Sequence, residues 1–342
     1  MQKKILWAVA GILAFQSATW ANGILGVAQD YNAFIFGNMN QSSDSEGALA
    51  VGGNLTLTSY SVASSLGNTG THLVVGKNLT MITGGSVNGD SYIGGDASFG
   101  VVAPTGNVYD VGNYSSFVDP TGTVYYGKSF SAPSWVKPAV KDTSITLPVD
   151  FNQAQTDLTT TSKYLNGLTN TGTYVDSFGA LTFTGSVDGL NVFSISASEL
   201  AAGSEIHINI PSNGFAIVNV TGATSVTLPN VGFWLNSADV LWNLYDFSSI
   251  TMGSFDGSIL APSAAVSFPS GDLNGTLVAA SLDDTVNGGS GELHNVPFTY
   301  NIPVLTGAPP TTVPLPPSVI AGGALLGILG LVKLRKRRRD SL

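Results

Sequence analysis

Apolar residues recur at every sixth position through much of the first half of the chain. Between residues 75 and 117 they are Val75, Met81, Val87, Ile93, Phe99, Val111 and Phe117, and the beat is interrupted once, at Thr105. An apolar side chain every six residues, with Gly and Asn at corners that need a positive φ, is typical of a β-solenoid with three short strands per coil. The hydrophobic pattern therefore predicts a stack of coils around one shared core.

A longer repeat in the same region supports this interpretation. Its pattern is an apolar residue, Gly, three further residues, Ser or Thr, and an apolar residue. Copies occur at residues 51–57, 75–81, 93–99 and 111–117. Because the last three copies start at even intervals, at Val75, Ile93 and Val111, the pattern predicts 18-residue coils made of three equal segments.

The second half of the chain repeats the 18-residue spacing in other letters. Residues 256–261 (DGSILA) and 274–279 (NGTLVA) are one such interval apart, and Leu241 lies the same interval before Ile259. The alternative, a β-sandwich, would show alternating strands every 8–12 residues or so. Two independent 18-residue series favour the solenoid, so we predict an all-β fold.

One segment, residues 150–167, departs from the β pattern. It follows Pro148 and places Phe151, Ala154, Leu158, Thr161 and Leu165 near one helical face. Asp150 with Gln153 three residues later indicates a capping box, and Gly167 is expected at C′. We expect this single long helix to pack along a face of the solenoid, between the two repeat series.

The N-terminus has the pattern of an export signal. Lys3 and Lys4 precede an apolar run over residues 5–15 and small residues up to Ala21. The run is too short to span a bilayer, so a cleaved secretory signal over residues 1–21 is expected in preference to a membrane anchor.

The C-terminus has three parts in the order of a stop-transfer signal. Residues 307–317 are rich in Pro, residues 318–334 are apolar, and residues 335–342 are basic. The basic residues begin with Lys333, near the end of the apolar segment. The others are Arg335, Lys336, Arg337, Arg338 and Arg339. By the positive-inside rule we expect them to stay cytoplasmic while the helix holds the protein at the membrane.

Charge separates the ends of the chain from its middle. Residues 22–332 carry five Lys and no Arg against 21 Asp and Glu, a net charge of −16. Nucleic acid is therefore excluded as a partner, because phosphate binding needs a basic surface. With no Cys and only 10% charged residues the chain is neither a disulfide scaffold nor disordered, and we expect one large domain over residues 22–306.

The tripartite tail resembles the bacterial C-terminal sorting signals of the Pro-Glu-Pro (PEP-CTERM) class. The motif here is Val313, Pro314, Leu315, Pro316 and Pro317, in which Leu315 stands where the class has Glu. The resemblance implies processing near this motif by exosortase, a membrane protease. A plain single-pass anchor is the alternative.

Four stretches resemble signature segments of choice-of-anchor A proteins, a group of secreted bacterial proteins that share one adhesive domain. They are residues 25–37 (LGVAQDYNAFIFG), 46–54 (EGALAVGGN), 257–262 (GSILAP) and 291–298 (GELHNVPF). The resemblance implies adhesion or matrix formation at the cell surface. The order of coils, helix, then coils also resembles the ice-binding adhesin fold, a discontinuous, right-handed solenoid with a helix alongside.

Catalytic residue patterns are sparse. His72, His207 and His294 are scattered, with no zinc-ligand spacing among them. His207 alternates with Ile206 and Ile208 and is expected on a strand, facing away from the core. Glu292 could pair with His294, but no nucleophile can be identified.

Solenoid enzymes acting on polysaccharides are the catalytic alternative. They neutralise uronate carboxylates with Arg or several Lys, and the middle of this chain has no Arg. The adjacent Asp283 and Asp284, the one such carboxylate pair, are expected in a turn. We therefore predict no enzyme activity and no cofactor.

Two binding alternatives stay open. Residues 84–96 partly match a calcium-binding repeat, although corner Asp and Asn residues explain them equally well. Ice binding would need regular Thr rows, and the Thr-x-Thr pairs at residues 56–58 and 182–184 do not recur at the coil spacing. The sequence thus predicts a secreted, surface-attached adhesin that contacts exopolysaccharide or another cell surface.

Overall fold

The computed structural model describes residues 23–102, 104–283 and 289–301, which belong to one compact unit, Trp20–Asn301. Its first half begins with a short 3-10 helix, Gly26–Asp30, and continues with thirteen strands. These are β1 (Ala33–Ile35), β2 (Met39–Ser45), β3 (Leu49–Val51), β4 (Leu55–Val62), β5 (Thr71–Val75), β6 (Leu79–Met81), β7 (Asp90–Ile93), β8 (Ala97–Phe99), β9 (Val108–Asp110), β10 (Asn113–Ser116), β11 (Val124–Tyr126), β12 (Ser129–Ser131) and β13 (Val140–Lys141).

The second half follows helix α1 (Phe151–Asn166). It also contains helix α2 (Ala197–Ala202) and a second 3-10 helix, Ser237–Asp239. Its strands are β14 (Thr173–Ser177), β15 (Ala180–Thr184), β16 (Leu190–Ser196), β17 (Glu205–Asn209), β18 (Phe215–Thr221), β19 (Ser225–Thr227), β20 (Gly232–Trp234), β21 (Val240–Asn243), β22 (Ser249–Thr251), β23 (Phe255–Asp256), β24 (Ser258–Ser267), β25 (Asp272–Asn274), β26 (Leu277–Asp283) and β27 (Glu292–His294).

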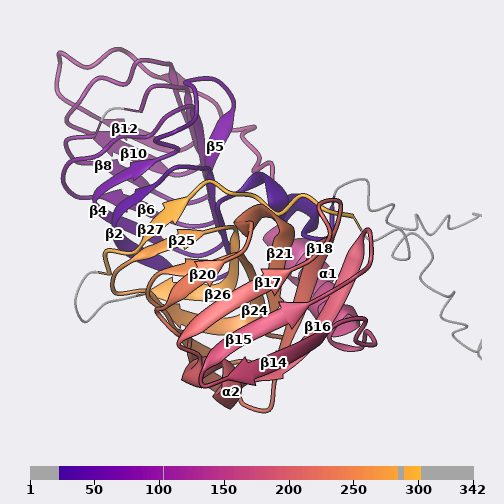
Figure 1. The fold of residues 1–342 in the computed structure, drawn as a ribbon. Helices are drawn as coiled ribbons and strands as arrows, with labels where there is room; N and C mark the ends of the chain where they lie inside the picture. Colours follow the sequence, from indigo (N-terminus) through magenta and orange to yellow (C-terminus); the bar gives the residue numbers. More distant parts are fainter. Residues whose placement is uncertain (1–22, 103, 284–288, 302–342) are drawn as a thin grey trace, which may run out of the picture. The chain divides into compact units, whose positions relative to one another are not determined.

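Twenty-three of the described strands form a parallel β-solenoid, as the sequence predicted, and β14, β15, β17 and β20 form a second sheet in which β14 runs antiparallel to β15. Strand β1 pairs with β3 on one side and with β26 on the other, so Ala33 lies between Leu49 and Leu277. The chain therefore enters in the middle of the stack, coils outward to β13, and later coils back toward β26, which makes the solenoid discontinuous. Figure 1 shows the indigo and purple coils of the first half and the orange coils of the second half meeting at this point.

The inward apolar beat is confirmed for its first five members. Val75, Met81, Val87, Ile93 and Phe99 are each at most 1% exposed and belong to one core cluster. In the β3–β5–β7 ladder, Val51 pairs with Val75 and Val75 pairs with Ile93. Each coil thus contributes side chains to a layer of the shared core.

The beat is wrong for its last two members, because the next coil is one residue shorter. Ile93 pairs with Asp110 and Phe99 pairs with Ser116, so each partner comes one position before the predicted residue. Val111 and Phe117 consequently fall just beyond the inward sites. Phe117 is 71% exposed.

In the second half, the predicted 18-residue pairing is confirmed between β24 and β26, where Ile259 pairs with Leu277. The predicted pairing of Leu241 with Ile259 is wrong by one residue. Trp242 pairs with Ile259, and Leu241 pairs with Ser258. Both Leu241 and Trp242 are fully buried, on opposite faces of β21, so hydrophobicity alone could not fix the register.

Helix α1 packs along a face of the solenoid, as predicted. Ala154, Leu158, Thr161 and Leu165 are buried on one side of it. On the facing strands, two buried Asn residues hold its last turns. Asn219 of β18 donates to the Leu165 carbonyl at 2.8 Å, and Asn243 of β21 donates to the Ser162 carbonyl at 2.9 Å.

The two ends of α1 differ from the predicted capping box and from the predicted C′ glycine. Asp150 is the N-cap and accepts from the backbone N–H groups of Asn152 and Gln153, but the Gln153 side chain donates to Asp157 and closes no capping box. Gly167 is the C-cap in a right-handed conformation, with φ −87°. The Leu165 carbonyl accepts from Asn219 and also from the Leu168 N–H at 3.1 Å, so this end of the helix is satisfied without a left-handed residue.

Candidate functional site

One face of the solenoid carries one small polar side chain per coil. The members of this polar row, in spatial order, are Thr227, Thr251, Ser267, Asp283, Asn40, Thr56, Thr80, Ser98, Ser115 and Ser131. All ten are exposed or half-buried. With strands about 4.8 Å apart, the row extends over roughly 43 Å.

The polar row exists because its neighbours along each strand point inward. Thr56 lies between Leu55 and Leu57, which are at most 1% exposed. Side chains alternate across a strand, so every coil that buries two such residues presents the one between them to solvent. The row is therefore held on a rigid, hydrogen-bonded sheet.

An asparagine ladder runs beside the polar row. Its members are Asn38, Asn54, Asn78, Asp96 and Asn113. Each side-chain Oδ1 accepts the backbone N–H of the next member, at 2.9, 3.2, 2.8 and 3.0 Å in turn. Asn113 donates to Asp96 Oδ1 from both its backbone N–H and its side-chain amide. These two bonds favour the carboxylate and lower the pKa of Asp96 below its ordinary value.

Part of the polar row coincides with the Ser or Thr of the sequence repeat, since Thr56, Thr80 and Ser98 occupy that position in three copies. The Thr-x-Thr pair at residues 56–58 does not recur, because Ile82 stands two residues after Thr80, but Thr56 itself pairs with Thr80 and the row continues with Ser98. The signal for the ladder was present, since Asn54, Asn78 and Asp96 each come three residues after the inward residue of the Gly motif.

Another face of the solenoid, formed by β23, β25, β27 and the end of β2, carries acidic side chains. Asp272 pairs with Glu292, and Leu293 of the same strand pairs with Ser45, which follows Asp44. A hydrogen bond with Asp44 and, as the second largest cause, burial raise the pKa of Glu292 above its ordinary value. No group of three or more His, Asp or Glu among the described residues is arranged to hold a metal ion.

The structure brings Glu292 and His294 together, as the sequence suggested. Glu292 Oε1 lies 3.7 Å from His294 Nε2, and His294 Nδ1 lies 2.9 Å from the Asn274 side-chain oxygen. The imidazole thus contacts a carboxylate and an amide, an arrangement that holds a side chain in place. His72 lies elsewhere, with Nδ1 3.0 Å from the Asn88 carbonyl.

His207 occupies the expected strand position. It is half-buried in β17, between the buried Ile206 and Ile208. Asp283 is not in the turn that the sequence predicted, because it ends strand β26 and pairs with Asn40. Asp284 lies outside the described residues. In the calcium-like segment, Asp90 and Asp96 accept backbone N–H groups of the next coil, as expected of corner residues.

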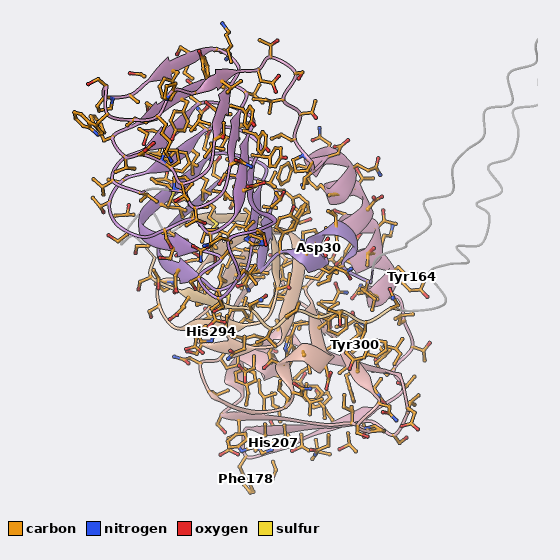
Figure 2. The ribbon with its side chains drawn as sticks, turned by 90° about the horizontal axis from the view of Figure 1, so that it is seen from above. Asp30, Tyr164, Phe178, His207, His294 and Tyr300 are labelled. Carbon is orange, nitrogen blue, oxygen red and sulfur yellow. The ribbon has the colours of Figure 1, made fainter. Side chains whose placement is uncertain are left out.

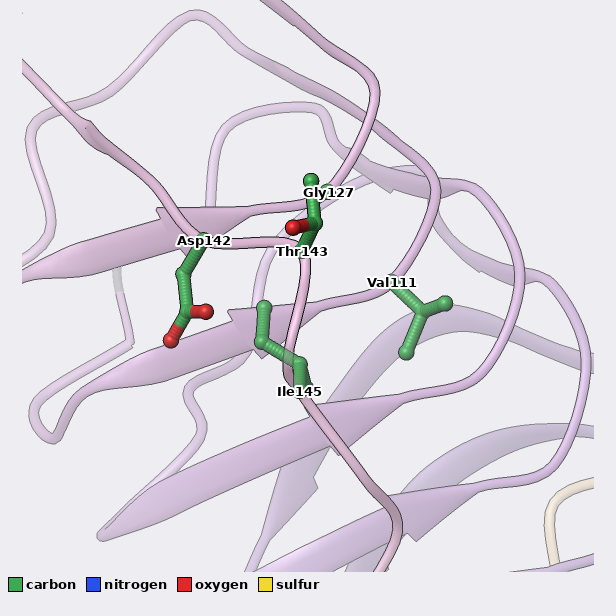
Figure 3. A pocket seen from close by; sticks show the side chains of 5 residues that line it. All are labelled: Val111, Gly127, Asp142, Thr143 and Ile145. Atoms are coloured by element: carbon green, nitrogen blue, oxygen red, sulfur yellow. The ribbon is translucent and has the colours of Figure 1, made fainter.

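Two concave sites among the described residues differ in size and openness. Figure 3 shows a pocket of about 80 Å³ lined by Val111, Gly127, Asp142, Thr143 and Ile145, well below the size of ordinary ligand pockets. A wider, open depression of about 360 Å³ has mainly polar walls. Its lining residues are Asn68, Thr69, Gly70, Asp90, Thr105, Gly106, Asn107, Thr121 and Gly122.

The predicted processing sites lie outside the described residues. They are the cleavage site after Ala21, the motif at residues 313–317 and the basic cluster at residues 333–339. Across the part of the chain that is described, no helix is long and apolar enough to cross a membrane.

Comparison with known proteins identifies the family of this chain. The family described as "Putative Ice-binding-like adhesive domain" matches residues 24–295, and the chain belongs to this family. Among solved structures, the crystal structure of an ice binding protein from an Antarctic bacterium, Flavobacteriaceae, is 12% identical over 80% of this chain and 97% of that chain, with a TM-score of 0.25. No curated protein matches. The described part of the chain is thus a β-solenoid that belongs to this family.

Proposed function

We propose that this protein is a non-catalytic adhesin of the cell surface or extracellular matrix, and that the polar row is the surface with which it contacts exopolysaccharide. The observation that carries the proposal is the alignment of ten small polar side chains on one continuous parallel sheet. Membership of an adhesive family supports the general function.

The geometry suits attachment to a repeating polymer. A single hydrogen bond contributes only about 0.5–1.5 kcal/mol, but many bonds along one polymer act together once the first has formed. The sheet and the asparagine ladder fix the positions of Thr56, Thr80 and Ser98 in advance. Little ordering entropy is then lost on contact.

Charge restricts the kind of polymer. With five Lys and no Arg against 21 carboxylates over residues 22–332, a uronate-rich polysaccharide would be repelled unless divalent cations lie between the two surfaces. A neutral polysaccharide needs no such bridge. Binding to an anionic polymer should therefore be lost in EDTA, whereas binding to a neutral polymer should persist.

The termini complete the proposal. The signal ending at Ala21 exports a choice-of-anchor A type domain, and the C-terminal helix holds it at the membrane until exosortase cuts near residues 313–317. The motif and the basic cluster from Lys333 to Arg339 support this order of events.

Ice binding is the second candidate, because two pairs of Thr residues lie in register on the same parallel sheet: Thr56 with Thr80, and Thr227 with Thr251. Asp283 and Asn40 interrupt the hydroxyl pattern between these pairs. Inhibition of ice recrystallisation by the purified protein would support this candidate, and its absence would leave adhesion alone.

The polar row can be tested by adding charge to it. Thr80→Glu with Ser98→Glu should weaken binding to cell-free exopolysaccharide at least tenfold. The matched control, Gln155→Glu with Thr160→Glu, adds the same charge on the exposed side of α1 and should bind as wild type does. Equal binding by both variants, with unchanged melting temperatures, would show that the polar row is not the adhesive surface.

Polysaccharide turnover tests the catalytic alternative. Incubation with a panel of polysaccharides should release no new reducing ends and no unsaturated sugars. Turnover that Glu292→Gln or His294→Ala abolishes would make the protein an enzyme.

A further inference from the structure

The four-stranded sheet β14–β15–β17–β20 has an outward face unlike the polar row. Val175, Thr182, His207 and Trp234 lie in register across its four strands, and we name them the aromatic row. Val175 is 63% exposed and Trp234 is 51% exposed. Trp234 lies beside His207, whose side chain is 30% exposed, so this end of the row presents two rings to solvent.

The two rings of the aromatic row are ordered. The His207 and Trp234 ring centroids are 4.4 Å apart and their planes differ by 4°. A side chain at Gly232 would lie 2.8 Å from the Trp234 ring, so the indole lies over this glycine. Neighbouring residues thus fix the indole orientation while about half of Trp234 stays exposed.

Polar groups border the rings. Glu205 Oε2 lies 3.2 Å from His207 Nε2, and the Glu205 side chain is 49% exposed. Thr184 and Asn209 form the adjoining pair across the same strands and are exposed. An aromatic surface with carboxylate, hydroxyl and amide groups beside it can recognise the apolar and polar faces of a sugar at once.

The turn between β14 and β15 is a second, independent sign of function. Phe178 is fully exposed and has a φ of 53°, followed by Gly179 with a φ of 89°. A type I′ turn with two positive φ values favours Asn-Gly, so Phe costs free energy both by its conformation and by its exposure. Figure 2 shows Phe178 and His207 at the same edge of the described unit.

Charge selects the ligand class. Residues 164–332 contain no Lys and no Arg, so this half has no fixed positive charge to bind phosphate, sulfate or uronate groups. We propose that the aromatic row binds a neutral polysaccharide, with a pyranose ring against the exposed indole of Trp234 and sugar hydroxyls on Glu205 and His207. This site is separate from the polar row, and its test is independent of that surface.

Native affinity gels test the proposal with the purified full-length protein. Gels containing hydroxyethyl cellulose or a soluble β-1,3-glucan should retard the wild type equally in low salt and in 0.5 M NaCl (about 3–5 Å screening length). Trp234→Ala and Trp234→Thr should weaken the retardation at least tenfold. Trp135→Ala is the matched control, because Trp135 is 72% exposed in the first half of the chain. It should leave retardation unchanged.

Four results would overturn the proposal. They are no retardation by any neutral polysaccharide, retardation by alginate alone, equal losses in the Trp135 and Trp234 variants, and a self-associated wild type that Trp234→Thr converts to monomer without changing retardation. The last result would assign the surface to a second copy of the chain. The Thr80→Glu, Ser98→Glu protein should still be retarded, which separates this site from the polar row.

Discussion

Asp110 occupies the inward position that Ile93 holds in the preceding coil, and the two residues pair directly between β7 and β9. The Asp110 side chain is fully buried. Its Oδ1 accepts the Gly112 N–H at 3.2 Å, while Oδ2 has no hydrogen-bond partner among the described residues. Burial raises the pKa of Asp110 from 3.8 to about 7.

The first prediction follows from this carboxyl group. Its folded pKa is higher than its unfolded pKa, so between pH 4 and pH 7 or so the folded state binds more protons and stability falls as pH rises. The melting temperature should therefore drop from pH 5 to pH 8. Asp110→Asn should reduce that drop by at least about 2 °C, equivalent to about 1 kcal/mol in a domain of this size.

The control for Asp110 is Asp188→Asn, which changes an exposed carboxylate. It should retain the wild-type pH dependence in the same calorimetric scans. An identical pH dependence in wild type and Asp110→Asn would mean that the buried carboxyl does not titrate in this range.

The second prediction concerns the inward beat itself. Ile93→Asp places a carboxylate in a core layer with no charge partner, at a cost of several kcal/mol, and should unfold the domain at pH 7. Ile82→Asp makes the same change at a residue that is 49% exposed and should alter stability by less than about 1 kcal/mol. Circular dichroism melts would contradict the inward assignment if Ile93→Asp melted like wild type.

The asparagine ladder provides the third prediction. Asn78→Ala removes the acceptor of the Asp96 N–H and should lower the free energy of unfolding by about 0.5–1.5 kcal/mol. Asn209→Ala, at an exposed strand position outside the ladder, should cost less. Equal effects of the two changes in denaturant titrations would argue that the ladder adds no stability.

The fourth prediction separates conformational strain from exposure at the β14–β15 turn. Phe178→Asn places the favoured residue at a positive φ and should stabilise the protein by up to about 1 kcal/mol. Phe178→Ala removes the ring but keeps an unfavourable residue at this position, so it should stabilise less. A larger gain with Ala in thermal melts would indicate that exposure, and not φ, dominates.

The fifth prediction concerns the C-terminal motif. Pro314→Ala with Pro316→Ala should leave an uncut membrane-bound form, whereas Pro309→Ala with Pro310→Ala in the same segment should be processed normally. Fractionation and mass spectrometry of the C-terminus would measure both. An intact C-terminus on all mature wild-type protein would make the tail a simple anchor.

Particular residues show how far the sequence could predict the fold. Val75, Ile93 and Phe99 were assigned inward from their spacing, because burial in a shared core favours apolar side chains at such positions in successive coils. Phe117 was assigned wrongly because the local motif is intact and only the coil length changes. The pairing of Phe99 with Ser116 shows this shift, which no single repeat reveals.

The candidate surfaces were less predictable than the core. Thr56, Thr80, Ser98, Ser115 and Ser131 align although each interval between successive members is shorter than the one before it. The Ser or Thr of the sequence repeat coincides with the row at Thr56, Thr80 and Ser98, but it points to Ser116 where the shorter coil places Ser115.

The sequence by itself determined the inward beat as far as Phe99, the N-cap at Asp150 and the strong negative charge of the middle of the chain, because each follows from local periodicity or composition. Only the tertiary structure decided that His207 and Trp234 stack on each other, although β18 and β19 of the other sheet separate their strands in the chain. It also decided that Asp110 enters the core beside Ile93. Both outcomes depend on the register between coils, which the length of every intervening corner sets, and hydrophobic pattern does not encode that length.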